Sequence, residues 1–150
     1  MKPEFYEDIR AFTLVELIVV SAILGVLAIM SIPLFTQYVN KTKSSRALAE
    51  IRNIEKDITA YIIDKNTLPP TLNDAGFTRP DPWERPYEYS IIGSGPAPLE
   101  NFIADPLNTD YDLYSKGPDG LSDAAAAHAT SADDIVRSND GGYAGLRAGL

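Results

Sequence analysis

The sequence predicts an α+β fold in which a long N-terminal helix packs on a small antiparallel sheet. No charged residue occurs from Leu17 to Phe35, which favours a helix inside a membrane. Apolar residues then recur at helical spacing as far as Pro69-Pro70, where a helix cannot continue. Beyond that pair, short alternating segments are separated by Pro, Gly, Asn and Asp, which is typical of strands and turns.

The uncharged segment predicts a membrane helix, because a helical crossing takes roughly 20 apolar residues. Gly25 and Pro33 lie inside it. Proline removes a backbone hydrogen bond and glycine lowers helix propensity, although membrane helices tolerate both better than soluble ones. We therefore expect a bend or local melting between Gly25 and Pro33.

Glu16 stands at the edge of this segment and is the most informative residue of the chain. A carboxylate beside lipid is costly, so Glu16 should have a partner. No Lys or Arg follows it within a helical turn or two, and the nearest cation before it is Arg10. Two explanations stay open: the side chain reaches the headgroups and water, or another molecule supplies a cation.

The helix continues after Pro33 as an amphipathic helix. Five apolar residues recur at spacings of three and four, which places them on one face: Leu48, Ile51, Ile54, Ile58 and Ile62. Charged residues such as Arg52 and Lys56 occupy the rest of the surface. We expect this helix to end near Asp64.

Two segments after the helix alternate apolar and polar residues and predict strands, Tyr87–Ile91 and Tyr111–Tyr114. Asn101–Ile103 is a weaker third candidate. A sheet this small cannot bury its apolar face alone, so we expect it to lie on the apolar stripe of the helix. The run Ala124–Ala127 predicts either a helical turn or an insert in a loop, and Gly141-Gly142 predicts a flexible C-terminal end.

Composition narrows the function. The chain has 150 residues, no cysteine and a net charge of −8, so a small core needs support from a metal ion or from sister subunits rather than from disulfides. From Asp74 onward there are thirteen acidic and five basic residues, which argues against nucleic acid as a ligand. With one histidine and neither a Gly-x-Ser-x-Gly elbow nor a phosphate loop, the sequence offers no active site, and we expect no enzyme.

Three stretches resemble one family of proteins. Ala11-Phe12-Thr13-Leu14-Val15-Glu16, followed by the apolar span, is similar to the processing and membrane-anchor motif of type IV pilins and type II secretion pseudopilins. Residues 81–89 (DPWERPYEY) and 111–120 (YDLYSKGPDG), with Asp133-Asp134-Ile135 downstream, resemble the major pseudopilins of type II secretion systems. The resemblance covers the chain from Ala11 to Ile135.

The resemblance implies processing and a location. A prepilin peptidase would cut between Ala11 and Phe12, and Phe12 would then be N-methylated. The chain would comprise a prepilin leader (1–11), a transmembrane and filament-core helix (12–35), an amphipathic continuation (36–66) and a small sheet-and-loop domain (67–150). It would cross the bacterial inner membrane once, with its C-terminal domain in the periplasm.

The resemblance also implies a role in assembly. The subunit would polymerise into a periplasmic pseudopilus that drives protein export, with the Glu16 carboxylate paired to the Phe12 amine of a neighbouring subunit. The implied partners are further copies of the chain in a helical homopolymer, minor pseudopilins, the inner-membrane assembly platform, prepilin peptidase and membrane lipid, and no nucleic acid.

Two alternatives belong to other classes. One is a type IV pilin of a surface pilus used for adhesion, motility or DNA uptake, against which the absence of a C-terminal cysteine pair speaks. The other is a monomeric, membrane-anchored calcium-binding module.

A C-terminal loop of calcium-binding type completes the expected fold. Ca²⁺ takes roughly six to eight oxygen ligands from carboxylates and carbonyls on flexible loops. By resemblance, the ligands are the carboxylates of Asp119, Asp133 and Asp134 and the main-chain carbonyl of Lys116, with Asp123 as a further candidate. The family's loop is shorter, whereas here Ala124–Ala132 intervenes. The alternative is that these aspartates cap turns and face water.

Overall fold

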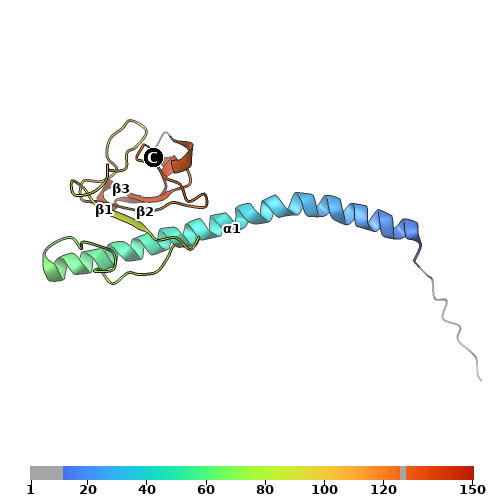
Figure 1. The fold of residues 1–150 in the computed structure, drawn as a ribbon, viewed down its shortest axis with the longest axis horizontal. Coiled ribbons are helices and arrows are strands. Elements are labelled where there is room, and N and C mark those ends of the chain that lie inside the picture. Colours follow the sequence, from blue (N-terminus) through green and yellow to red (C-terminus); the bar gives the residue numbers. More distant parts are fainter. Residues whose placement is uncertain (1–11, 126–127) are drawn as a thin grey trace, which may run out of the picture. The chain divides into compact units, whose positions relative to one another are not determined.

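A computed structural model describes residues 12–125 and 128–150 (Figure 1). The chain forms two compact units that divide between Val39 and Asn40. Helix α1 (Leu14–Lys65) begins in the first unit, and the second unit contains the rest of that helix and a four-stranded antiparallel sheet. The predicted α+β fold is therefore confirmed.

Local hydrogen bonds define both ends of α1. Before its first turn, the Thr13 hydroxyl accepts a bond from the Glu16 N–H (3.2 Å), and the Glu16 carboxylate accepts one from the Thr13 N–H (3.0 Å). This reciprocal capping box satisfies N–H groups that lack partners within the helix. At the other end, Asn66 takes a left-handed conformation (φ 54°) and donates its N–H to the Ile62 carbonyl (2.7 Å), so the helix ends where the sequence predicts.

In the first unit, α1 continues without a break through Gly25 and Pro33, so the expected local melting is not seen. Hydroxyl side chains within the apolar segment donate to carbonyls one turn back, Ser21 to Leu17 (2.7 Å) and Ser31 to Leu27 (2.8 Å). These polar groups are thereby satisfied inside the helix itself. By length and composition, α1 could cross a membrane.

In the second unit, α1 buries the predicted apolar stripe. Ile51, Ile54 and Ile58 are fully buried, and Leu48 and Ile62 pack partly buried beside them. The face that covers them comes from the sheet and from the loops around it: Phe77, Tyr87, Tyr111, Leu113 and Ile135. Each fully buried isoleucine contributes about 1.5–3 kcal/mol relative to an exposed one, so this face holds the second unit together.

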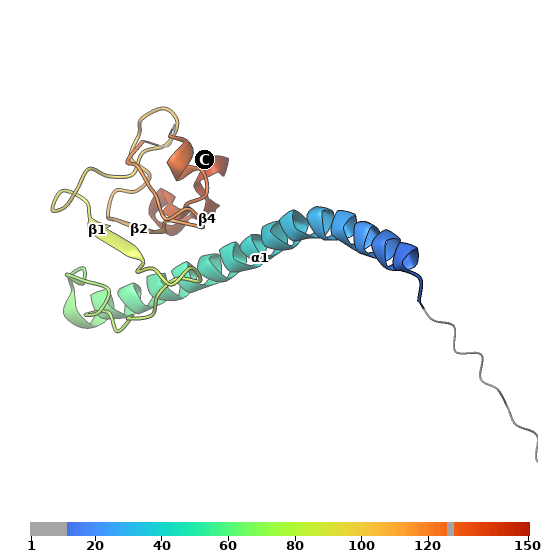
Figure 2. The ribbon, with the colours of Figure 1, turned by 45° about the vertical axis from the view of Figure 1, so that its right-hand side comes forward.

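The sheet consists of antiparallel strands that pair in chain order: β1 (Glu88–Ile91), β2 (Tyr111–Ser115), β3 (Ile135–Ser138) and β4 (Tyr143–Leu146) (Figure 2). Strands β1 and β2 lie where the alternating segments predict them. Strand β4 pairs with β3 so that Leu146 stands opposite Ile135. This register brings the residues after β4 alongside the acidic residues before β3.

Two predictions about the second unit are wrong. The segment Asn101–Ile103 is a turn, because the Asn101 side chain accepts hydrogen bonds from the backbone N–H groups of Ile103 and Asp105 (3.0 Å each). Such bonds compete with strand pairing. The C-terminal end is not a flexible tail, because β4 pairs with β3 along its whole length.

Short 3-10 helices complete the described part of the unit: Ala129–Ser131, Asn139–Gly141 and Arg147–Gly149. The first of them follows the run Ala124–Ala127, whose described residues Ala124 and Ala125 are bends and not helix. Ala126 and Ala127, which belong to the same run, lie outside the described residues.

Candidate functional site

The first candidate site is the N-terminal end of α1, where the sequence places Glu16. Its Oε2 atom accepts hydrogen bonds from both the N–H (3.0 Å) and the hydroxyl (2.8 Å) of Thr13. This partner was not predicted, although Thr13-Leu14-Val15-Glu16 has the capping-box pattern. In residues 12–125 and 128–150, no Lys or Arg pairs with Glu16, so nothing there neutralises its charge.

Phe12 lies one helical turn before Glu16 and is largely exposed. Ala11, the residue expected before the cut, and the rest of the leader lie outside the described residues. Processing between Ala11 and Phe12 and pairing of Phe12 with Glu16 therefore stay predictions.

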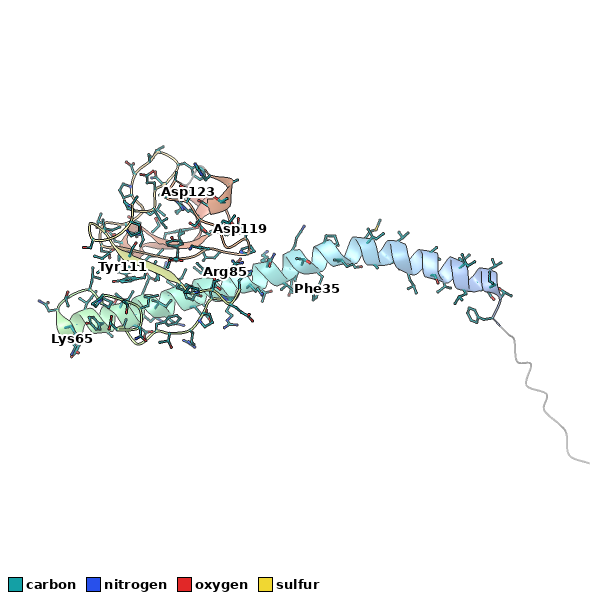
Figure 3. The ribbon with its side chains drawn as sticks, viewed as in Figure 1. Phe35, Lys65, Arg85, Tyr111, Asp119 and Asp123 are labelled. Carbon is teal, nitrogen blue, oxygen red and sulfur yellow. The ribbon has the colours of Figure 1, made fainter. Side chains whose placement is uncertain are left out.

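From this end to Phe35, α1 presents apolar side chains outward in all directions, as Figure 3 shows. Large side chains such as Leu17, Ile23 and Met30 are more than half exposed. Monomeric proteins in water rarely expose contiguous apolar surface on this scale, and such surfaces mark contacts with membranes or other proteins. This half of α1 is built to be covered by something other than its own chain.

The second candidate site is the loop between β2 and β3, which holds the predicted oxygen ligands (Asp119 is labelled in Figure 3). The Asp133 carboxylate accepts a hydrogen bond from the Asp119 N–H (3.1 Å), and the Asp119 carboxylate accepts one from the Leu121 N–H (2.8 Å). The Lys116 carbonyl accepts one from the Gly120 N–H (3.2 Å). These oxygens close a turn through backbone donors, as the turn-capping alternative describes.

Gly117 allows this turn to pack closely. Its φ is 59°, and a Cβ atom at this position would lie 2.2 Å from the Asp133 carbonyl oxygen. Only glycine fits such an approach, so the start of the loop is held against the residues before β3.

Asp134 has different surroundings from its neighbour Asp133. It is fully buried, and its Oδ2 accepts a hydrogen bond from the Ser122 hydroxyl (2.6 Å) and lies 3.4 Å from Nη1 of Arg147. Burial raises the pKa of the Asp134 carboxyl to about 7, whereas the Ser122 hydrogen bond and the positive charge of Arg147 act in the opposite direction. Its Oδ1 has no hydrogen-bond partner among the described residues.

These residues do not converge as a calcium site. Ca²⁺ needs roughly six to eight oxygens around one point. In the described part of the chain, no group of three or more acidic or histidine side chains is placed to hold a metal ion. The further candidate, Asp123, pairs its carboxylate with Nδ1 of His128 (3.2 Å) near the surface. Calcium binding at the four predicted ligands stays a prediction, and the observed donor set does not fit the ion.

A buried network centred on Arg137 was missed by the sequence analysis. The guanidinium binds both carboxylate oxygens of Asp110 (2.7 and 2.8 Å) and one of Glu55 (3.0 Å), and it lies 4.0 Å from the ring centre of Tyr111. These contacts join α1 to β2 and β3. The available signal was an arginine directly after Ile135-Val136, because a charge beside buried strand residues requires a partner.

Comparisons with known proteins agree on the class of this chain. Residues 8–32 match the family described as the prokaryotic N-terminal methylation motif. The type II secretion system core protein G of Pectobacterium carotovorum subsp. carotovorum is 32% identical over 125 residues, which are 75% of this chain and 78% of that protein. The protein of the same name from Dickeya chrysanthemi is 31% identical over 123 residues, 76% of this chain and 80% of that protein.

A fimbrial protein of Pseudomonas aeruginosa is 33% identical over only 75 residues, 46% of this chain and 49% of that protein. No solved structure matches the chain.

The apolar first half of α1 and the methylation motif at its start define a pilin-like subunit anchored through its N-terminal helix. The extent of the similarity over the second unit identifies the branch. This chain belongs to the family of type II secretion system core protein G, the major pseudopilins. The resemblance found in the sequence is thereby confirmed.

Proposed function

We propose that this chain polymerises into the pseudopilus of a type II secretion system and so drives protein export. Its membership in the core protein G family supports this role. The first half of α1 anchors the subunit in the inner membrane, and the second unit lies in the periplasm. The contribution of the chain is self-assembly, and energy for export comes from another component of the machine.

The observation that carries this proposal is the exposure of the apolar side chains around the first half of α1. Lipid covers this surface while the subunit waits in the membrane, and identical helices cover it in the fibre. A contact that uses two different faces of the same chain does not close on itself and generates an open filament. The same apolar surface therefore serves both as anchor and as filament core.

Glu16 selects the register of the polymer. In the described part of the chain its carboxylate contacts Thr13 alone, and a carboxylate in an apolar filament core requires a cation. After cleavage behind Ala11, the free amine of Phe12 on a neighbouring subunit supplies that cation. Only one offset between two helices brings the amine and the carboxylate together.

The remaining partners follow from this assembly route. Prepilin peptidase removes residues 1–11, and the inner-membrane assembly platform and the minor pseudopilins start and support the growing polymer. Membrane lipid is the partner of the unassembled subunit.

The test compares Glu16→Ala with Thr13→Ala in cells that produce the secretion system. Both changes remove the capping box, which weakens the start of a helix by about 0.5–2 kcal/mol, but only Glu16→Ala removes the carboxylate. We expect Glu16→Ala to remain in the membrane fraction and to lose most of its fibres, and Thr13→Ala to keep a larger share of them. The mass of the mature N-terminus in each variant shows whether the leader has been removed.

Two outcomes contradict the role of Glu16. A fibre yield of Glu16→Ala equal to that of the unmodified chain shows that the carboxylate does not direct assembly. Equal losses in the two variants show that Glu16 acts by capping α1 and not by pairing between subunits.

A type IV pilin of a surface pilus is the second candidate. The similarity to the fimbrial protein covers less than half of this chain, whereas the similarity to core protein G covers about three quarters of it, and this difference favours the pseudopilus. A deletion strain that secretes its enzymes normally but lacks fibres on the cell surface would reverse this choice.

A further inference from the structure

Arg147, near the C-terminal end, is a positive charge enclosed by the protein. Its side chain is 1% exposed, which is rare for arginine. A buried cation is stable only where oxygens replace its water shell. The surroundings of this guanidinium therefore show what the position is built to hold.

Four oxygens surround the guanidinium, and three of them are main-chain carbonyls. Nη1 donates to the Asp123 carbonyl (2.6 Å) and lies 3.4 Å from Oδ2 of Asp134. Nη2 donates to the Glu100 carbonyl (2.9 Å) and to the Ala124 carbonyl. We call these four oxygens the carbonyl cage. Carbonyls combined with a carboxylate form the kind of donor set that calcium-binding loops use.

The cage joins segments that are distant in sequence. Glu100 lies between β1 and β2, Asp123 and Ala124 lie in the loop before β3, and Asp134 directly precedes β3. Pairing of β4 with β3 and a hydrogen bond from the Arg147 N–H to the Asp134 carbonyl (2.9 Å) place the arginine beside them. One side chain thus ties the last residues of the chain to the loop.

The acids expected to bind calcium do not face this cage, with the exception of Asp134. The Asp133 carboxylate accepts a hydrogen bond from the Asp119 N–H, and the Asp119 carboxylate accepts one from the Leu121 N–H. The unpartnered Oδ1 of Asp134 is the one observation in favour of a second cation. A divalent ion there would lie next to the guanidinium, and two like charges at such a distance repel strongly in a buried site.

We infer that the guanidinium of Arg147 is the resident cation of the loop between β2 and β3, and that this loop closes without a bound calcium ion. Ala124, the first residue of the insert, contributes one of the carbonyls, so hydrogen bonds from Arg147 connect the insert to the C-terminal end of the chain. This inference concerns the folding of the second unit and does not depend on fibre formation.

The test measures the midpoint temperature of unfolding, Tm, of the full chain in detergent micelles, followed by the fluorescence of Trp83, the only tryptophan. The unmodified chain is compared in millimolar CaCl₂ and in excess EGTA, and ⁴⁵Ca retention is measured in parallel. We expect no difference in Tm and no retained calcium. A Tm that falls in EGTA, or retention of one calcium ion per chain, overturns the inference.

Three substitutions test the charge itself. Arg147→Met keeps much of the side-chain volume but leaves the cage without a cation, and Arg147→Lys keeps the charge with fewer donors. The matched control is Arg46→Met, because the Arg46 side chain is 65% exposed in its pair with Glu50. We expect Arg147→Met to lower Tm by roughly 10 °C or more, Arg147→Lys by less, and Arg46→Met by no more than about 4 °C.

The order of these variants decides the outcome. If Arg147→Met is as stable as Arg147→Lys or as the control, the positive charge is not what holds the loop, and the inference fails. If Arg147→Met does not fold, the comparison of Arg147→Lys with Arg46→Met and the EGTA experiment on the unmodified chain still decide it.

Discussion

The two units of this chain satisfy their side chains in opposite ways, although one helix runs through both. In the second unit, the apolar residues Ile51, Ile54 and Ile58 of α1 are buried against the sheet. Glu55 on the same helix forms ion pairs with Arg52 and Arg137. In the first unit, the apolar side chains of the same helix are exposed. There the acid Glu16 binds only the helix-capping Thr13 among the described residues.

This difference separates what the chain completes alone from what it leaves to other molecules. The second unit has a core, and its buried charges have partners from its own sequence. From Phe12 to Val39, the part of the first unit that the structure describes, the chain has an uncovered apolar surface and a carboxylate without a cationic partner, which lipid and further subunits are suited to cover. Fold stability and assembly should therefore respond to different substitutions along one helix.

The largest effect on the free energy of unfolding is expected from truncating an isoleucine of α1 to alanine, compared between the two units. Ile54→Ala removes a fully buried isoleucine and should lower the free energy of unfolding of the second unit by about 2–5 kcal/mol. Ile23→Ala removes one that is 55% exposed and should change it by less than about 0.5 kcal/mol. Denaturant titration of the full chain in micelles, followed by Trp83 fluorescence, measures both values.

Fibre yield in cells is the second measurement on these two isoleucine variants. Ile23→Ala should reduce fibre formation without loss of folded protein, because its site belongs to the surface that other copies cover in the proposed filament. Equal losses of unfolding free energy in the two variants would show that the first unit also contributes to the fold, and the contrast between the units would be lost.

A smaller effect is expected from the polar contacts of the second unit. The Tyr87 hydroxyl donates to the Glu50 carboxylate (2.6 Å), and burial together with this acid raises the pKa of Tyr87. Tyr87→Phe keeps the ring against Phe77 but loses this bond, which should cost about 1.5 kcal/mol because the acceptor is charged.

The control for this variant is Tyr143→Phe. Tyr143 is 37% exposed, and among the described residues its hydroxyl makes one long bond of 3.4 Å, to the Leu146 carbonyl, so its removal should cost less than about 0.5 kcal/mol. If the two phenylalanine variants lose the same free energy of unfolding, the Glu50 contact does not stabilise the second unit.

The helix and its apolar stripe could be predicted because their signal is periodic and local. The same holds for β1 and β2, whose alternating residues have one face on the core. Strand β4 could not be predicted in this way, because its small residues Ala144 and Gly145 carry no alternating pattern, and pairing with β3 defines it. A strand that is defined by its pairing partner and not by its own residues leaves no local pattern in the sequence.

The buried arginines were missed for a related physical reason. Arg137 and Arg147 bind oxygens from segments that the fold alone brings together, and a charged residue in the sequence usually indicates a solvated surface. The acidic loop is a separate case, and calcium binding there stays a prediction. Asp119 and Asp133 are residues of the kind that bind calcium, but their carboxylates accept hydrogen bonds from backbone N–H groups, which only the structure shows.

The smallest effect is expected at Asp140, an exposed counterpart of Glu16. Its two carboxylate oxygens accept the N–H (2.7 Å) and the hydroxyl (2.8 Å) of Thr109, and these bonds lower the pKa of Asp140. Because the pKa in the folded state lies below that in the unfolded state, the ionised group stabilises the fold above the unfolded value of about 3.9, and this contribution disappears as the pH falls through the folded value.

Asp140→Asn should therefore cost no more than about 0.5 kcal/mol at neutral pH, and the difference from the unmodified chain should shrink in strong acid. Denaturant titrations at a series of pH values measure it. A difference that stays constant with pH would mean that the amide loses a shape-dependent contact and not a charge. Asp140 and Glu16 both accept hydrogen bonds from the N–H and the hydroxyl of a threonine, Asp140 through both carboxylate oxygens and Glu16 through Oε2. In the proposed filament Glu16 lies among apolar side chains, whereas Asp140 is exposed to water. A small effect at Asp140 beside a large loss of fibres in Glu16→Ala would assign the latter to the apolar surroundings of Glu16.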